Sequence, residues 1–191
     1  MTRVVLGGNG FDTFVPSGFT DSYVKLALVP AAVDVDALPR PLTLDSFDGL
    51  DTAHRPVVRT YTVRRADPVA RELTIDFVVH GEHGVAGPWA ARAQPGDPVY
   101  LSGPGGAYAP DRAADWHLLA GDEAALPAIG AALEALDDDA VGQVFIEVAG
   151  PDDEVELTRP DGVRLTWVHR GGRADLVSED RIQHEIERLR H

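Results

Sequence analysis

The pattern of apolar residues changes near Arg112, and this change limits the possible folds more than any other feature of the chain. Before it, apolar runs are short and β-rich and are broken by Gly and Pro clusters. After it, compact strand-like runs alternate with helical spacing, as at Ile129, Leu133 and Leu136. Short strands between turns are typical of an antiparallel barrel, and strands that alternate with helices form a parallel sheet. We therefore predict a β-barrel domain at 1–112 and an α/β domain at 113–191.

The expected strands follow this division. In the first domain they are Arg3–Leu6, Tyr23–Val29, Val57–Arg64, Glu72–His80 and Pro98–Leu101. In the second domain they are Trp116–Ala120, Val141–Val148 and Arg164–His169, followed by a polar helix at Glu179–Arg190. Three parallel strands are fewer than a complete nucleotide-binding domain contains. Trp116 and Trp167 are expected to lie in the core.

Composition excludes several classes of protein. The 191 residues carry a formal net charge of -14, from 31 acidic and 17 basic residues, so a nucleic acid is not an expected partner. Cysteine is absent, which excludes disulfides, thiolate metal sites and cysteine nucleophiles. No apolar run approaches the roughly 18 residues of a membrane span, so we expect a cytoplasmic protein that does not insert into a membrane.

The tetrapeptide Arg59-Thr60-Tyr61-Thr62 combines three useful chemistries on one strand. Alternation places Arg59 and Tyr61 on one face, and a local twist is needed to bring Thr62 to the same ligand. An arginine supplies forked donors for a phosphate, a tyrosine offers a flat face to a ring system, and a threonine hydroxyl bonds a ring nitrogen. An ordinary amphipathic strand with an exposed arginine has the same pattern, so both interpretations remain open.

A second segment joins the strand that ends at His80 to a glycine-containing loop and a short helix that begins at Pro88. Proline is tolerated in the first turn of a helix because its missing N–H has no partner there. The free amides and the helix dipole at such a terminus favour an anion such as a diphosphate. Turn formation alone explains the glycines equally well.

A third segment, Gly121-Asp122-Glu123, follows an apolar strand and precedes a helix. In open α/β sheets ligands bind at this carboxyl edge. Two acidic side chains repel phosphate, so a nicotinamide or flavin ring is the better ligand here. The alternative is a helix cap formed by Asp122.

Other chemistries find little support. His80, Glu82 and His83 lie close in sequence, but no further cluster of ligands accompanies them, and we predict no metal site. Ser17 and Ser102 lack a recognisable histidine and aspartate arrangement for a hydrolase.

Taken in order, the motifs resemble those of the siderophore-interacting proteins, which are FAD-containing ferric-siderophore reductases of the ferredoxin–NADP reductase superfamily. The matching segments are Arg59-x-Tyr61-Thr62, Asp76-Phe77-Val78-x-His80-Gly81, Gly84–Trp89-Ala90, Pro95-Gly96-Asp97, Gly103-Pro104-Gly105-Gly106 and Gly121-Asp122-Glu123-x-Ala125-Leu126-Pro127-Ala128. The resemblance implies a flavin-binding barrel, an α/β domain for NAD(P)H, and an FAD-dependent ferric-siderophore reductase. Electrons would come from NAD(P)H or reduced ferredoxin and would pass through the flavin to the Fe(III)-siderophore.

The resemblance also implies roles for individual residues. Residues expected to bind FAD are Arg59, Tyr61, Thr62, Asp76, Val78, His80, Gly84, Val85, Ala86, Gly87 and Trp89. Residues expected to face NAD(P)H are Gly121, Asp122, Glu123 and Ala125. Lys25 matches a lysine that attracts the anionic siderophore. The chain has Gly105 where the family often has an arginine, so another flavin oxidoreductase of the superfamily is an alternative. The short nucleotide half leaves a non-catalytic flavin- or siderophore-binding module as a third possibility.

Overall fold

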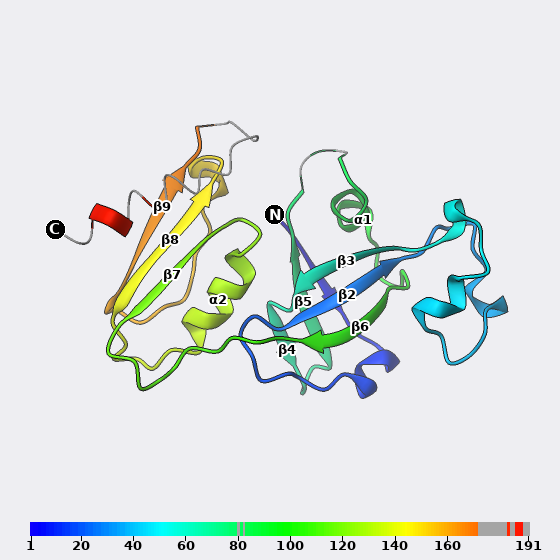
Figure 1. The fold of residues 1–191 in the computed structure, drawn as a ribbon, viewed down its shortest axis with the longest axis horizontal. Helices are drawn as coiled ribbons and strands as arrows, with labels where there is room; N and C mark the ends of the chain where they lie inside the picture. Colours follow the sequence, from blue (N-terminus) through cyan, green and yellow to red (C-terminus); the bar gives the residue numbers. More distant parts are fainter. Residues whose placement is uncertain (80, 82, 172–182, 184–185, 189–191) are drawn as a thin grey trace.

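The computed structural model shows two lobes joined by one connection (Figure 1). It describes residues 1–79, 81, 83–171, 183 and 186–188. The N-terminal lobe contains β1 (Thr2–Leu6), β2 (Tyr23–Leu28), β3 (Val57–Thr62), β4 (Arg65–Asp67), β5 (Glu72–Phe77), α1 (Ala86–Arg92) and β6 (Tyr100–Gly105). The C-terminal lobe contains β7 (His117–Asp122), α2 (Leu126–Glu134), β8 (Gly142–Val148) and β9 (Val163–His169). Short 3₁₀ helices lie in the connections: η1 (Asn9–Thr13), η2 (Val35–Ala37), η3 (Leu44–Phe47), η4 (Thr52–His54) and η5 (Pro151–Asp153).

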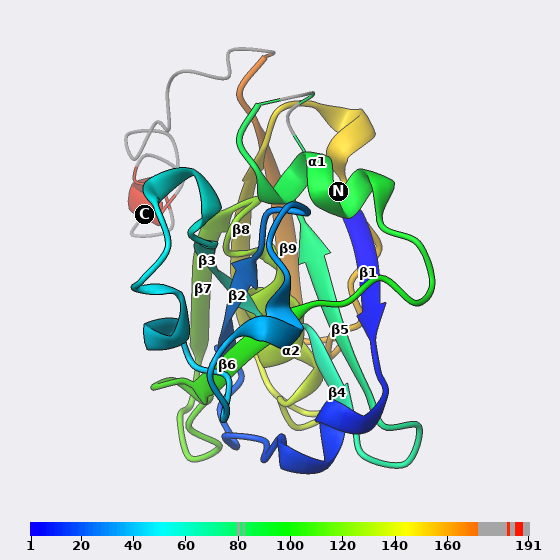
Figure 2. The same cartoon turned by 90° about the vertical axis from the view of Figure 1, so that its right-hand side faces the viewer.

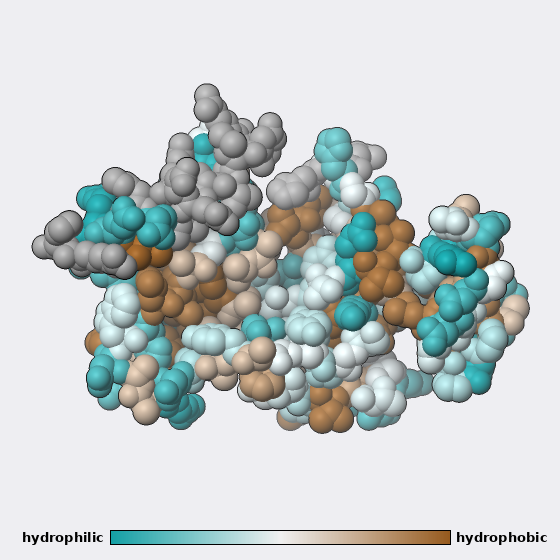
Figure 3. All heavy atoms as spheres, in the orientation of Figure 1, coloured by the Kyte–Doolittle hydropathy of each residue, from teal (hydrophilic) through white to brown (hydrophobic). Residues whose placement is uncertain are grey.

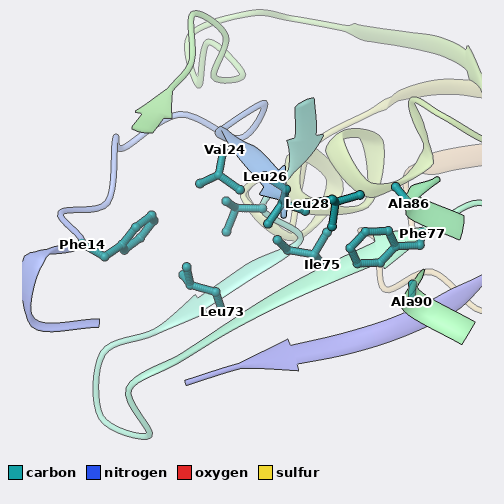
Figure 4. Close-up of a cluster of buried hydrophobic side chains, with 10 residues drawn as sticks. Phe14, Val24, Leu26, Leu28, Leu73, Ile75, Phe77, Ala86 and Ala90 are labelled. Atoms are coloured by element: carbon teal, nitrogen blue, oxygen red, sulfur yellow. The ribbon is translucent and has the colours of Figure 1, made fainter. Parts of the chain in front are cut away.

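The N-terminal lobe is built from two three-stranded antiparallel sheets, in the orders β1-β5-β4 and β3-β2-β6. Alternate residues of β2 and β5 point into the space between the sheets, where Leu26, Ile75 and Phe77 are completely buried (Figure 4). Burial of each such side chain contributes about 1.5–3 kcal/mol. Helix α1 covers one end of the two sheets (Figure 2), with Ala86 and Ala90 packed into the same core. The predicted antiparallel β-structure is confirmed, although no ladder of hydrogen bonds joins the two sheets within the described ranges.

Strand β6 runs farther than the sequence indicated. The prediction was a strand over Pro98–Leu101, whereas the strand of the structure begins at Tyr100 and continues to Gly105. An edge strand tolerates proline because a missing N–H on its free side costs no ladder bond. The register with β2 shifts between Tyr23 and Lys25, which accommodates the irregular glycine and proline segment.

The C-terminal lobe contains a parallel sheet in the order β7-β8-β9, with α2 covering one face (Figure 1). Leu126, Ile129 and Leu133 of α2 pack on Val144 and Ile146 of β8. The helix stripe and the buried strand therefore form one core, and the predicted parallel sheet is confirmed.

The two tryptophans of this lobe differ in burial. Trp167 packs against the core, as expected, but Trp116 is 48% exposed. Trp116 precedes β7, which is an edge strand, so no neighbouring strand covers its outer side. Residues 183 and 186–188 are helical, and the rest of the predicted helix at Glu179–Arg190 lies outside the described residues. Where the structure is described, no helix has the length and apolar character that a membrane crossing requires.

Candidate functional site

Three aromatic side chains from three elements meet at one end of the N-terminal lobe. The ring of Tyr61 on β3 lies 4.3 Å from that of Phe77 on β5, and Phe77 lies 5.6 Å from Trp89 on α1, measured between centroids. Phe77 is fully buried, while Tyr61 and Trp89 are partly exposed. Burial raises the pKa of the Tyr61 phenol, and the nearby charge of Arg59 opposes this shift. The phenol is therefore uncharged at neutral pH and presents a flat apolar surface.

Arg59 lies on the same face of β3 as Tyr61. In the register with β2, Arg59 is opposite Leu26 and Tyr61 is opposite Val24, so alternation gives them a common side. The Arg59 guanidinium donates to the Val58 carbonyl at 2.9 Å and pairs with no carboxylate in the part of the chain that the structure describes. This exposed cation is available to an anionic ligand.

Thr62 ends β3 opposite Tyr23, and alternation places it on the other face of the sheet from Tyr61. The three residues of the motif are therefore adjacent in the chain, but only two share a face. An approach of Thr62 to a ligand bound on the Tyr61 side remains a prediction.

Two glycines that precede α1 face open space. Gly81 and Gly84 have positive φ values of 58° and 77°, and a Cβ at either position would meet no atom within 4 Å among those described. Helix α1 begins at Ala86, two residues before the predicted start at Pro88. At Gly87 an added Cβ would lie 3.3 Å from the Val78 carbonyl oxygen, so glycine allows the helix to pack closely on the chain after β5.

Asp76 is already paired. Its carboxylate accepts two hydrogen bonds from Arg3 of β1, from Nε at 2.7 Å and from Nη2 at 2.8 Å. Asp76 is 7% exposed, and its side chain lies on the other face of β5 from that of Phe77. It fastens β1 to β5, and a direct contact with FAD remains a prediction. The same holds for Val78, which is partly exposed, and the predicted role of His80 falls on a residue outside those described.

A buried ion cluster occupies the carboxyl edge of the parallel sheet. Arg170, just after β9, donates to the carboxylates of Glu123 and Glu147, the latter at 3.3 Å. The Arg170, Glu123 and Glu147 side chains are 8%, 15% and 1% exposed. Sequence reasoning did not identify Arg170, although an arginine directly after a buried strand was a usable signal.

The other residues predicted at this edge shape the turn into α2. The Asp122 carboxylate accepts hydrogen bonds from the amides of Ala124 at 2.9 Å and Ala125 at 3.2 Å. A Cβ at Gly121 would lie 3.1 Å from Ile129 Cδ1, so glycine lets β7 and α2 approach each other. In Figure 3 the surface is hollowed between the lobes, on the side where α1 and the carboxyl ends of β8 and β9 lie.

Lys25, the one lysine of the sequence, lies on the opposite face of the β3-β2-β6 sheet from Arg59 and Tyr61. It is exposed and makes no hydrogen bond or ion pair with a described residue. It lines a cavity of about 630 Å³ whose walls include Phe11, Phe14, Phe47, Tyr100 and Ser102. None of the residues predicted to bind FAD lines this cavity, which is also bordered by the core residues Phe14 and Leu73.

Comparison with known families accounts for nearly the whole chain. Residues 1–108 match the family model described as the siderophore-interacting FAD-binding domain, and residues 114–190 match the family model described as siderophore-interacting protein. The chain belongs to the siderophore-interacting protein family. The predicted family is thereby confirmed, and the two matched segments meet near the change in apolar pattern at Arg112.

Several curated proteins are similar to this siderophore-interacting protein. An uncharacterised protein of Mycobacterium tuberculosis is 73% identical over 181 residues, covering 95% of this chain and 64% of that protein. Ferric vibriobactin reductase ViuB of Vibrio cholerae is 45% identical over 170 residues, covering 89% and 61%. NADPH-dependent ferric-chelate reductase of Escherichia coli is 34% identical over 169 residues, covering 87% and 64%. The chain thus spans somewhat less than two thirds of the length of these relatives.

Solved structures agree on the architecture. A siderophore utilization protein from T. fusca is 39% identical, with a TM-score of 0.79, and the match covers 97% of this chain and 69% of that one. Ferredoxin-NADP⁺ reductase from Plasmodium falciparum, at 12% identity and a TM-score of 0.60, shares the fold over 90% of this chain and 64% of that one. The siderophore-interacting protein therefore has a ferredoxin–NADP reductase-like fold.

The residues present fit an FAD cofactor. Tyr61 provides a partly exposed ring, Arg59 on the same face provides a guanidinium that pairs with no described carboxylate, and Gly81 and Gly84 face open space before α1. These are the donor types that a ring system and a diphosphate require. Within the described ranges, no group of three or more His, Asp or Glu side chains is arranged to hold a metal ion.

Proposed function

We propose that this siderophore-interacting protein is a cytoplasmic FAD-dependent ferric-siderophore reductase. The observation that carries the proposal is the common face of Arg59 and Tyr61, which lies beside the buried core and within the segment matched by the FAD-binding family model. Outer-sphere electron transfer requires proximity and a tuned cofactor, so no nucleophile or general base is needed.

Arg59 would bind an FAD phosphate, and Tyr61 would pack against the flavin ring. The backbone of residues 84–87 would hold the diphosphate, with Trp89 behind it and Thr62 near the reactive edge of the ring. When bound, FAD would supply the ability to accept a hydride and to pass single electrons to Fe(III). Because a hydride carries two electrons, one NAD(P)H would reduce two Fe(III).

The electron donor would approach the carboxyl edge of β7, at Gly121, Asp122, Glu123 and Ala125. A relative that is named NADPH-dependent supports NADPH as this donor. Reduced ferredoxin is the second candidate donor. The ion pair with Arg170 would keep the Glu123 carboxylate in one orientation at this edge.

The substrate would be a ferric siderophore attracted by Lys25, whose charge no described carboxylate neutralises. The name of the V. cholerae relative supports this class of substrate. Lys25→Met should raise KM for an anionic ferric siderophore and leave flavin reduction by NADPH unchanged. Lys25→Arg, which retains the charge, should behave like the parent protein.

The decisive experiment follows the visible spectrum under anaerobic conditions. FAD-loaded protein should lose its oxidised-flavin band when NADPH is added. The band should return when a ferric siderophore is added. A ferrous chelator should then trap two equivalents of Fe(II) for each equivalent of NADPH consumed. Protein without FAD is the control. A reduced flavin that persists beside the ferric siderophore would contradict the proposal.

A second candidate function is another flavin oxidoreductase activity of the same superfamily. Gly105 supports it, because an added Cβ would lie only 2.5 Å from the Tyr23 hydroxyl, so the tyrosine covers the position where the family often has an arginine. Turnover on ferric siderophores should be compared with turnover on ferredoxin and quinones. If the iron chelates are the poorest acceptors, the second candidate replaces the first. If no donor reduces the flavin, the protein is instead a non-catalytic flavin- or siderophore-binding module.

A further inference from the structure

An ion pair between Arg64 and Glu134 joins the two lobes directly. Arg64, two residues after the end of β3, donates both terminal nitrogens to the Glu134 carboxylate at the end of α2, Nη1 at 3.0 Å. The Arg64 side chain is only 12% exposed, although it follows a surface strand, and the Glu134 side chain is 40% exposed. A bidentate contact between arginine and a carboxylate fixes orientation as well as distance.

A glycine on α2 makes room for this arginine. A Cβ at Gly130 would lie 3.1 Å from Arg64 Nε and 3.3 Å from Cζ and Nη2. These separations are shorter than ordinary contacts between nonbonded atoms. The guanidinium therefore lies flat against one helical turn, with Gly130 beneath it and Glu134 at its end.

The base of Arg64 is also held. Its amide donates to the Thr74 carbonyl at 2.9 Å, and the amide of Val63 donates to the Ser22 carbonyl at 2.7 Å. Val63 is buried. The corner after β3 is thus attached to β5 and to the start of β2, so the arginine projects from a rigid part of the N-terminal lobe.

The pair connects the two halves of the proposed redox site. Arg64 is two residues from Thr62 of the flavin motif, and Glu134 ends the helix that begins just after the donor motif at 121–125. Helix α2 has nine residues and spans about 13 Å, which makes it a short rigid lever. We propose that Arg64, Gly130 and Glu134 form an interlobe latch that positions the donor edge of β7 relative to the flavin motif.

This inference rests on the proposed function for its catalytic meaning, so the first test measures geometry alone. Because the chain has no cysteine, Val69→Cys and Asp161→Cys can carry two spin labels without background. Val69 is 93% exposed in the N-terminal lobe, and Asp161 is exposed in the C-terminal lobe. Pulsed electron spin resonance should show one narrow distance distribution for the parent protein. Glu134→Gln should broaden it or add a longer component.

Two further variants sharpen the test. Gly130→Ala should broaden the distribution in the same way, and it should not unfold α2, because alanine is a better helix former than glycine. Asp12→Asn is the matched control, because Asp12 pairs with Arg71 at 2.7 Å within the N-terminal lobe. Its distribution should equal that of the parent. Unchanged distributions in both Glu134→Gln and Gly130→Ala would overturn the latch.

Kinetics then test the positioning role. In FAD-loaded protein, Glu134→Gln should slow flavin bleaching by NADPH at least tenfold, with unchanged FAD stoichiometry and unchanged reduction by dithionite. A normal NADPH rate beside a broadened distance distribution would overturn the positioning role. If NADPH bleaches no flavin even in the parent protein, the proposed donor is wrong, and the distance measurement still decides whether the latch exists.

Discussion

The ring of Tyr61 lies 4.3 Å from the ring of Phe77, centroid to centroid, and this contact joins the two sheets of the N-terminal lobe. Phe77 is fully buried and also contacts Trp89 of α1. The inner side of Tyr61 is therefore supported by the core, while the part of the ring that remains exposed is available to a ligand. A ligand ring stacked on Tyr61 would therefore contact a side chain that the core holds in place.

Substitution of Tyr61 should separate stacking from hydrogen bonding. Tyr61→Phe keeps the ring and should bind FAD nearly as tightly as the parent. Tyr61→Ala removes an aromatic contact worth about 0.5–1.5 kcal/mol, so the dissociation constant for FAD should rise about 2- to 12-fold. Fluorescence titration of FAD measures both constants. Equal affinities for the alanine variant and the parent would remove Tyr61 from the flavin site.

Arg59 should contribute through charge. A hydrogen bond to a charged group is worth about 1.5–3 kcal/mol, so Arg59→Ala should weaken FAD binding by about 10- to 150-fold. The loss should shrink at high salt because exposed charges are screened. Arg65→Ala is the control, since Arg65 is exposed on β4 and pairs with Asp67 at 3.2 Å. If both variants bind FAD equally well, Arg59 has no role in binding the phosphate.

The Arg170 cluster should stabilise the C-terminal lobe. Arg170→Ala removes the cation that donates to the Glu123 and Glu147 carboxylates, and breaking a buried ion pair costs about 3–5 kcal/mol. Urea unfolding of this variant should show that loss. Arg164→Ala, an exposed arginine on β9, should change the unfolding free energy by less than about 0.5 kcal/mol. A loss below about 1 kcal/mol for Arg170→Ala would show that the cluster does not contribute to stability.

The interlobe latch should depend on pH at the acidic end. The hydrogen bond from Arg64 holds the pKa of Glu134 below its usual value, with smaller contributions from the charges of Arg65 and Arg3. A depressed carboxyl pKa gives stability that is present above the unfolded value of about 4.3 and is lost as the pH falls through the folded value. The difference in unfolding free energy between the parent and Glu134→Gln should therefore be constant from about pH 8 to 5 and shrink below about pH 4. A difference that stays constant down to pH 3 would contradict the ionic basis of the latch.

The fold was predictable where the signal is local. The alternation in Val24–Leu28 and the helical spacing of Ile129 and Leu133 state which side of each element is apolar, and burial of that side assembles the sheets and α2. The shared face of Arg59 and Tyr61 follows from the same alternation. The roles of these two side chains toward FAD came from the resemblance to a family and remain proposals.

Other features depended on neighbours that local patterns do not reveal. Trp116 has a large apolar side chain of the kind found in protein cores. It is nevertheless exposed, because it precedes β7, which is an edge strand. The predicted strand ended at Leu101, before the glycine and proline segment, but β2 provides a partner that extends β6 to Gly105. Asp76 is a plausible polar ligand in sequence, and only the pairing of β1 with β5 shows that Arg3 already binds it.

The sequence by itself determined the antiparallel and parallel halves and the strand that carries Arg59 and Tyr61, because each depends on residue order within one segment. It also determined the family, because the motifs follow one another in a specific order along the chain. Tertiary structure alone decided that Arg64 contacts Glu134 seventy positions away, and that Arg170 reaches Glu123 across forty-seven. Such pairs form when packing of the two cores brings distant segments together. The physical reason is that oppositely charged side chains far apart in the sequence form a hydrogen bond only after burial of apolar surface has placed them within reach of each other.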